Sequence, residues 1–138
     1  MALLDKIRII ERDLRLDKRG WFLKTLNGFE QFLPDRTGEI YLTMALPEEW
    51  RANHFHKLAD EWFTVFSGQA LLILEDVETK ERMEIELDGA VPKTIFVPAG
   101  VAHVFKNTSE EKPMLLLAYA SETYDPRDTI AYRLLTNL

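Results

Sequence analysis

The stretch His54-Phe55-His56-Lys57-Leu58-Ala59-Asp60-Glu61 decides the fold and the chemistry expected of this chain. In an extended chain, side chains two residues apart point to the same face, so His54 and His56 can present two imidazoles to one point. The only other histidine, His103, follows a Pro-x-Gly turn at residues 98–100. We therefore expect three imidazoles and the Glu61 carboxylate to form one metal site.

The residue types available restrict the metal. Cysteine is absent, so any metal must be held by nitrogen and oxygen. Three histidines and one carboxylate suit zinc, which we expect first. Iron, nickel and manganese remain alternatives, because this ligand set does not select among these metals. A single histidine is more often a surface or core residue, but the shared spacing favours one divalent metal per chain.

Length and charge exclude several classes of protein. The 138 residues predict one domain, and 46% hydrophobic with 29% charged residues is an ordinary globular composition. The net charge of −6 argues against a nucleic-acid partner. No apolar run is long enough for a membrane span, and the charged start does not resemble a secretory signal, so we expect a cytoplasmic protein without a membrane partner.

Short segments rich in β-forming residues recur between turn residues. Alternation of Met83, Ile85 and Leu87 with glutamates predicts a half-exposed strand, whereas the apolar run at residues 70–74 predicts burial on both faces. The pattern indicates an all-β sandwich or barrel with a short C-terminal helix over residues 127–135. The expected strands cover residues 7–10, 20–26, 40–46, 61–66, 69–75, 82–87, 94–97, 103–107 and 114–120.

The motif His-x-His-x4-Glu-x6-Gly, followed by Pro-x-Gly-x2-His-x3-Asn, is similar to the two motifs of the cupin superfamily, which are small jelly-roll β-barrels. The resemblance implies a single cupin domain over residues 1–138, with His54, His56, Glu61 and His103 as metal ligands. A glycine usually opens each motif, and here Glu48 and Pro92 stand at those positions. Neither is a ligand, so these departures concern the loops.

Flanking segments resemble enzymes that act on nucleotide sugars. The segment Asp17-Lys18-Arg19-Gly20-Trp21-Phe22 resembles Asp-x-Arg-Gly-x-Phe of the RmlC-like nucleotide-sugar epimerases. Arg51 matches the Arg-x-x-His segment of these enzymes and of sugar 3,4-ketoisomerases. The resemblance implies that Arg51 and Arg19 bind the nucleotide diphosphate. Phe63 shares its strand face with Glu61, so we expect it to line the same cavity.

A closer likeness is to the C-terminal cupin domain of bifunctional capsule-sugar enzymes, which epimerise a UDP-linked 4-keto-6-deoxy sugar. Residues 51–56 stand in register with Arg-Gly-Asn-His-Tyr-His of that family, and residues 120–126 are similar to its ending. The likeness covers roughly residues 13–135. It implies epimerisation or isomerisation of a nucleotide-linked 4-keto-6-deoxy sugar in cell-surface polysaccharide synthesis. We also expect a homodimer, because small barrels with apolar strands often pair their sheets.

Such a reaction needs a base other than a metal-bound imidazole, to take a proton from carbon beside the ketone. The candidates are Lys57 and the tyrosines Tyr41, Tyr119, Tyr124 and Tyr132. Tyr119 is preferred because it ends an apolar strand and could face the barrel interior. Lys57 is adjacent to the site in sequence, although strand alternation points it away from His56.

Two other functions fit the same ligands. A metal-dependent cupin dioxygenase would use iron, nickel or manganese with open coordination positions. A metallo-cupin without catalytic activity would use the metal only to orient a small molecule. The fold alone does not choose among these functions.

Overall fold

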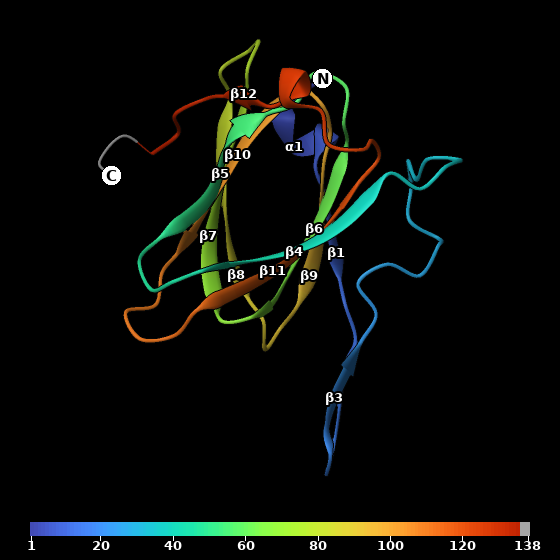
Figure 1. Cartoon of the computed structure of the whole chain (residues 1–138), viewed down its shortest axis with the longest axis vertical. Helices are drawn as coiled ribbons and strands as arrows, with labels where there is room; N and C mark the ends of the chain where they lie inside the picture. The colour runs from blue at the N-terminus through green and yellow to red at the C-terminus, as the bar shows by residue number, and fades with distance from the viewer. Residues whose placement is uncertain (136–138) are drawn as a thin grey trace.

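Two antiparallel five-stranded sheets pack face to face as a jelly-roll barrel in the computed structural model, which describes residues 1–135 (Figure 1). The first sheet has the strand order β1-β9-β6-β11-β4 and the second β12-β5-β10-β7-β8, while β2 and β3 form a separate hairpin. The strands are β1 (Arg8–Glu11), β2 (Leu14–Asp17), β3 (Gly20–Leu23), β4 (Glu39–Ala45), β5 (Trp50–Phe55), β6 (Glu61–Ser67), β7 (Gln69–Asp76), β8 (Arg82–Asp88), β9 (Lys93–Val97), β10 (Val101–Asn107), β11 (Met114–Ala120) and β12 (Ile130–Ala131).

The nine expected strands all form, with ends shifted by a few residues, and the jelly-roll class is confirmed. Three further strands, β2, β5 and β12, and the short helix α1 (Leu3–Lys6) were not expected. The helix expected over residues 127–135 is reduced to one 3-10 turn, η1 (Pro126–Asp128). The chain cannot continue as a helix because Ile130 and Ala131 pair with β5 instead.

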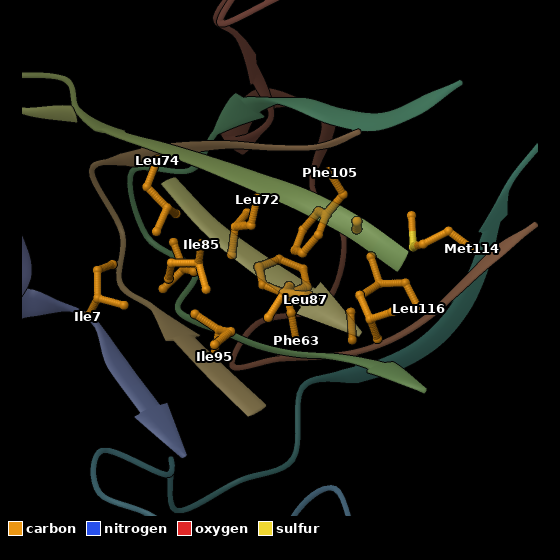
Figure 2. Packing of buried hydrophobic residues seen from close by; sticks show 14 of the residues in the cluster. Ile7, Phe63, Leu72, Leu74, Ile85, Leu87, Ile95, Phe105, Met114 and Leu116 are labelled. Carbon is orange, nitrogen blue, oxygen red and sulfur yellow. The ribbon is translucent and has the colours of Figure 1, made fainter. Parts of the chain in front are cut away.

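The core lies between the two sheets (Figure 2). Leu72 and Leu74 of β7 meet Phe105 of β10 and Phe63 of β6 there, and all four side chains are almost fully buried. In β8, Ile85 and Leu87 point into this core and the intervening glutamates are exposed, as the alternation predicts. Burial of this apolar surface is the main force that holds the two sheets together.

Apolar clusters also cover the outer face of each sheet. Ile73 of β7 packs with Val104 and Leu134 outside the second sheet, which confirms the expectation that residues 70–74 are buried on both faces. Outside the first sheet, Trp62 and Phe96 form another cluster beneath the segment of residues 24–38. Within residues 1–135 there is no helix with the length and apolarity that crossing a membrane requires.

Asn107 joins the end of β10 to two neighbouring loops, and its replacement by leucine should destabilise the fold. Its side chain is fully buried, and its Nδ2 group donates to the main-chain carbonyls of Ala45, Leu46 and Lys112 at 3.1, 3.1 and 2.8 Å. Each buried polar group left without a partner costs about 1–3 kcal/mol, so Asn107→Leu should lower the free energy of unfolding in urea by at least about 2 kcal/mol. The control Gln69→Leu, at an exposed position, should change the free energy of unfolding little. Equal stability of Asn107→Leu and the unaltered protein would contradict this role of Asn107.

Candidate metal centre

A β-bulge in β5 sets the direction of the first proposed ligand. His54 pairs with His103 of β10, but the next pair is Ala52 with Val104, so Asn53 has no partner in β10. Ala52 and Asn53 adopt positive φ angles of 76° and 69° to make this bulge. Paired residues share a face of the sheet, so His54 and His103 both point into the barrel.

The four side chains singled out by the sequence meet at one end of the barrel. Their ligand atoms all lie within 4.8 Å of one another. Oε1 of Glu61 is 2.7 Å from Nε2 of His56 and 3.5 Å from Nε2 of His103. The ring centroid of His54 lies 4.8 Å from that of His56 and 5.0 Å from that of His103. Glu61 and His103 are buried, whereas His54 and His56 are partly exposed on the cavity side.

Main-chain carbonyls fix the orientation of two imidazoles. Nδ1–H of His56 donates to the carbonyl of Asp128 (2.7 Å), and Nδ1–H of His103 donates to that of Val101 (3.0 Å). In each ring, Nε2 is thereby turned toward Glu61. Such outer bonds are typical of metal-ligating histidines, because they fix the tautomer that presents a lone pair.

The pKa shifts of His54 and Glu61 favour their metal-binding forms, while that of His56 depends on the Glu61 carboxylate. Burial, together with the charges of His103 and His56, lowers the pKa of His54 to about 4. Burial alone would raise the pKa of Glu61, but the adjacent imidazoles of His103 and His56 outweigh it and hold that pKa well below its usual range. Burial would lower the pKa of His56, but the hydrogen bond and charge of Glu61 reverse the direction and raise it. At neutral pH the site thus contains an ionised carboxylate and a neutral His54, which are the metal-binding forms.

The arrangement fits a divalent metal. With Nδ1–H of His56 donated to Asp128, the 2.7 Å contact between Nε2 of His56 and Oε1 of Glu61 joins two acceptor atoms, which needs a proton or a cation between them. Nε2 of His103 is buried without a hydrogen-bond partner among residues 1–135. Tetrahedral ligands about 2.1 Å from zinc lie about 3.4 Å apart, within the range of distances seen here.

A cavity of about 480 Å³ opens beside these ligands. Small side chains on β11 make room for it: Ala120 lies between Glu61 of β6 and Glu39 of β4. Tyr41 reaches across β11, and its hydroxyl donates to Oε2 of Glu61 (2.9 Å). The lining residues are Glu39, Tyr41, His54, His56, Ala59, Glu61, Ala120, Glu122, Thr123, Tyr124, Asp125, Asp128 and Thr129.

Tyr119, the base preferred from the sequence, does not face the barrel interior, so that expectation is wrong. It packs with Trp62 and Phe96 on the outer face of the first sheet. Its neighbours Ala118 and Ala120 occupy the inner face, because side chains alternate along β11. Two other tyrosines line the cavity instead, Tyr41 and Tyr124.

Phe63 and Lys57 also lie away from the cavity. Phe63 is 1% exposed and packs on the rings of His103 and Phe105, so it supports His103 from the core and has no surface for a substrate. Lys57 is exposed and borders a separate hollow beside Lys6. Lys57 follows His56 in the loop after β5, where its amide donates to Oδ1 of Asp128 (2.8 Å).

The two arginines expected at the diphosphate do not line the cavity in this chain. Arg51 is exposed in β5, three residues before His54, and its Nε–H donates to the carbonyl of Met44 in β4 (2.7 Å). Arg19 lies in the turn of the β2–β3 hairpin, which projects away from the barrel (Figure 1).

The Asp-x-Arg-Gly segment has a structural role in this turn. Oδ1 of Asp17 accepts the amides of Arg19 (2.8 Å) and Gly20 (3.1 Å), and Gly20 takes a φ of 143°. These contacts close the hairpin. The guanidinium of Arg19 lies 3.5 Å from Asp17 and is 92% exposed.

Comparisons with known proteins agree with the fold and the domain type. The profile described as "Polysaccharide biosynthesis C-terminal domain" matches residues 15–132. The spore coat polysaccharide biosynthesis protein SpsL of Bacillus subtilis (strain 168) is 24% identical over 129 residues, which cover 90% of this chain and 84% of that protein.

Solved structures share the barrel. The dTDP-6-deoxy-D-glucose-3,5-epimerase RmlC from Legionella pneumophila, in complex with dTDP-4-keto-L-rhamnose, superposes with a TM-score of 0.82 at 19% identity over 97% of this chain and 76% of that one. The capsular polysaccharide assembling protein CapF from Staphylococcus aureus gives 0.67 at 23% identity over 89% of this chain and 33% of that one. The fold is thus that of the RmlC-like cupins.

Proposed function

The chain belongs to the polysaccharide biosynthesis C-terminal domain family, and from this premise and the site we propose that it is a metal-dependent epimerase or isomerase of a nucleotide-linked 4-keto-6-deoxy sugar. The structural neighbours include epimerases of such sugars. The observation that carries the proposal is the convergence of His54, His56, Glu61 and His103 beside an open cavity. Zinc is the proposed metal, with iron, nickel or manganese as alternatives, because imidazole nitrogen and carboxylate oxygen are ordinary zinc ligands but do not exclude the other three.

The cavity suits the sugar better than the diphosphate. Its volume of about 480 Å³ can hold a hexose, whose hydroxyls can donate to Glu39 and Glu122. No lysine or arginine of residues 1–135 lines it. The diphosphate should therefore lie outside the cavity, toward Arg51.

The chemistry requires removal of a carbon-bound proton beside the ketone. A divalent cation in this site would stabilise the negative charge that then develops on the carbonyl oxygen. The main-chain carbonyls that accept Nδ1–H of His56 and His103 hold both imidazoles toward Glu61 before substrate arrives. Tyr124, at the cavity wall and 64% exposed, is positioned to exchange a proton with substrate and solvent.

Deuterium exchange tests this function. In D2O, a nucleotide-linked 4-keto-6-deoxyhexose should gain deuterium at carbon beside the ketone when the zinc-loaded protein is added. Binding of the same compound without deuterium uptake would instead indicate a binding module. Oxygen uptake by the iron-loaded protein with a diketone or thiol would indicate a dioxygenase.

Arg51→Ala should weaken substrate binding and leave the metal in place. Arg51 is exposed in the strand that carries His54, and a charge-assisted bond to phosphate contributes about 1.5–3 kcal/mol. We expect KM to rise about 10- to 100-fold with one metal per chain retained. Loss of metal from this variant, or an unchanged KM, would contradict a role at the diphosphate.

A homodimer is also proposed, with β4 at the contact. This strand is an edge of the first sheet, and its outward side chains Ile40, Leu42 and Met44 are 62%, 66% and 39% exposed. An open edge with an apolar face is a site for pairing with a second copy. Sedimentation velocity should give a dimer for the unaltered protein and a monomer for Leu42→Glu, whereas the control Val91→Glu, in an exposed turn, should remain dimeric.

A further inference from the structure

Asp128 has a buried carboxylate that is not one of the four proposed metal ligands. It contacts the loop between two of them, His56 and Glu61. It is 8% exposed. Its Oδ1 accepts the amides of Lys57 (2.8 Å) and Leu58 (3.0 Å), and its Oδ2 accepts the amide of Ala59 (3.1 Å). One side chain therefore satisfies three successive main-chain donors of the loop that leads from His56 to Glu61.

The main chain of the same residue holds a ligand directly. The carbonyl of Asp128 accepts Nδ1–H of His56 at 2.7 Å, which directs Nε2 toward Glu61. The residue thus acts on the site in two ways, through the loop backbone and through the imidazole ring.

The chain after Asp128 pairs with the strand that carries His54, the other histidine of the first motif. Ala131 of β12 pairs with His54. In the bulge of β5, Oδ1 of the Asn53 side chain accepts the amide of Leu134 (2.7 Å). The main-chain carbonyl of Asn53 accepts the amide of Tyr132 (3.0 Å). Residues 128–134, which we term the C-terminal clamp, therefore contact the backbone or side chain on either side of both histidines of the first motif.

We propose that Asp128 is a positioning residue for the metal centre and that docking of the C-terminal clamp and binding of metal are thermodynamically linked. This inference rests on the metal site of the proposed function. Without the carboxylate, three amides near the cavity lose their acceptor and the His56–Glu61 loop is free to relax. A relaxed loop no longer holds Nε2 of His56 opposite Glu61, so the metal loses a preformed ligand.

The first test measures the zinc dissociation constant by competition with a chromophoric chelator. Asp128→Ala should weaken zinc binding about 10- to 100-fold, as outer-shell changes commonly do. Asp128→Asn keeps one oxygen acceptor, so its loss should be smaller. The matched control is Asp88→Ala, which removes a carboxylate that accepts the amide of Ala90 (2.8 Å) in the β8–β9 turn and should leave zinc affinity unchanged. The absorption spectrum of bound cobalt should change in the Asp128→Ala variant only.

The second test needs no substitution. Zinc should slow hydrogen exchange at the amides of residues 57–59, 132 and 134 of the unaltered protein, and leave that of Ala90 unchanged. Equal zinc affinity and cobalt spectrum in Asp128→Ala, or no zinc effect on these amides, overturns the inference while the metal centre stands. Absence of zinc binding by the unaltered protein overturns both.

Discussion

The His56→Ala variant is expected to purify without its metal and to lose catalysis. His56 is the ligand best suited to this test, because it follows the end of β5 at the cavity wall and its removal leaves the core between the sheets intact. Elemental analysis should find one zinc per chain in the unaltered protein and almost none in the variant. Loss of a preorganised electrostatic stabiliser typically costs about 100- to 1000-fold in rate, so deuterium exchange should fall by at least about 100-fold.

Two controls give this experiment its meaning. Leu58→Ala alters an exposed residue of the same loop and should retain both metal and activity. Metal removal from the unaltered protein by a chelator should reproduce the loss of His56→Ala, and added zinc should restore it only in the unaltered protein. Full metal content in His56→Ala would remove the basis of the proposed chemistry. Full activity after chelation would assign the reaction to the side chains alone.

The cluster of His54, His56, Glu61 and His103 could be predicted from the sequence because each half of it is set by a short local motif. His54 and His56 share a face by simple alternation, and a turn delivers His103. The existence of β5 itself was missed, since Trp50–Phe55 is polar in places and interrupted by a bulge at Asn53. Pairing with β10 and β12 stabilises it, and such long-range pairing leaves no local pattern.

Tyr119 shows where alternation fails as a predictor. Both faces of β11 are apolar and largely buried, because the segment of residues 24–38 covers the outer face as the second sheet covers the inner one. The sequence therefore does not indicate which of Tyr119 and Ala120 points inward. Asp128 was missed for a related reason, since its contacts join residues about seventy positions apart and follow from the return of the chain to β5.

Position in the cavity favours Tyr124 over the other tyrosines as the proton-transfer group. Tyr41 also lines the cavity, but its hydroxyl donates to Glu61, and burial together with the Glu61 charge raises its pKa well above the usual range. A phenol held in this way keeps its proton. Tyr124 is 64% exposed, so its hydroxyl can reach both substrate and water.

Tyr124→Phe should therefore lower kcat by about 100- to 10000-fold, the usual contribution of a positioned acid or base, and leave zinc content unchanged. KM should change little, because the ring that remains still forms the cavity wall, and a selective loss of kcat indicates an interaction made in the transition state. Steady-state kinetics of sugar conversion, with elemental analysis of the same samples, would measure both effects. Tyr119→Phe is the matched comparison, since Tyr119 packs against Trp62 on the far side of the sheet and should retain the unaltered rate. The opposite result, full activity in Tyr124→Phe and a slow Tyr119→Phe, would mean that the reacting carbon lies elsewhere than in this cavity.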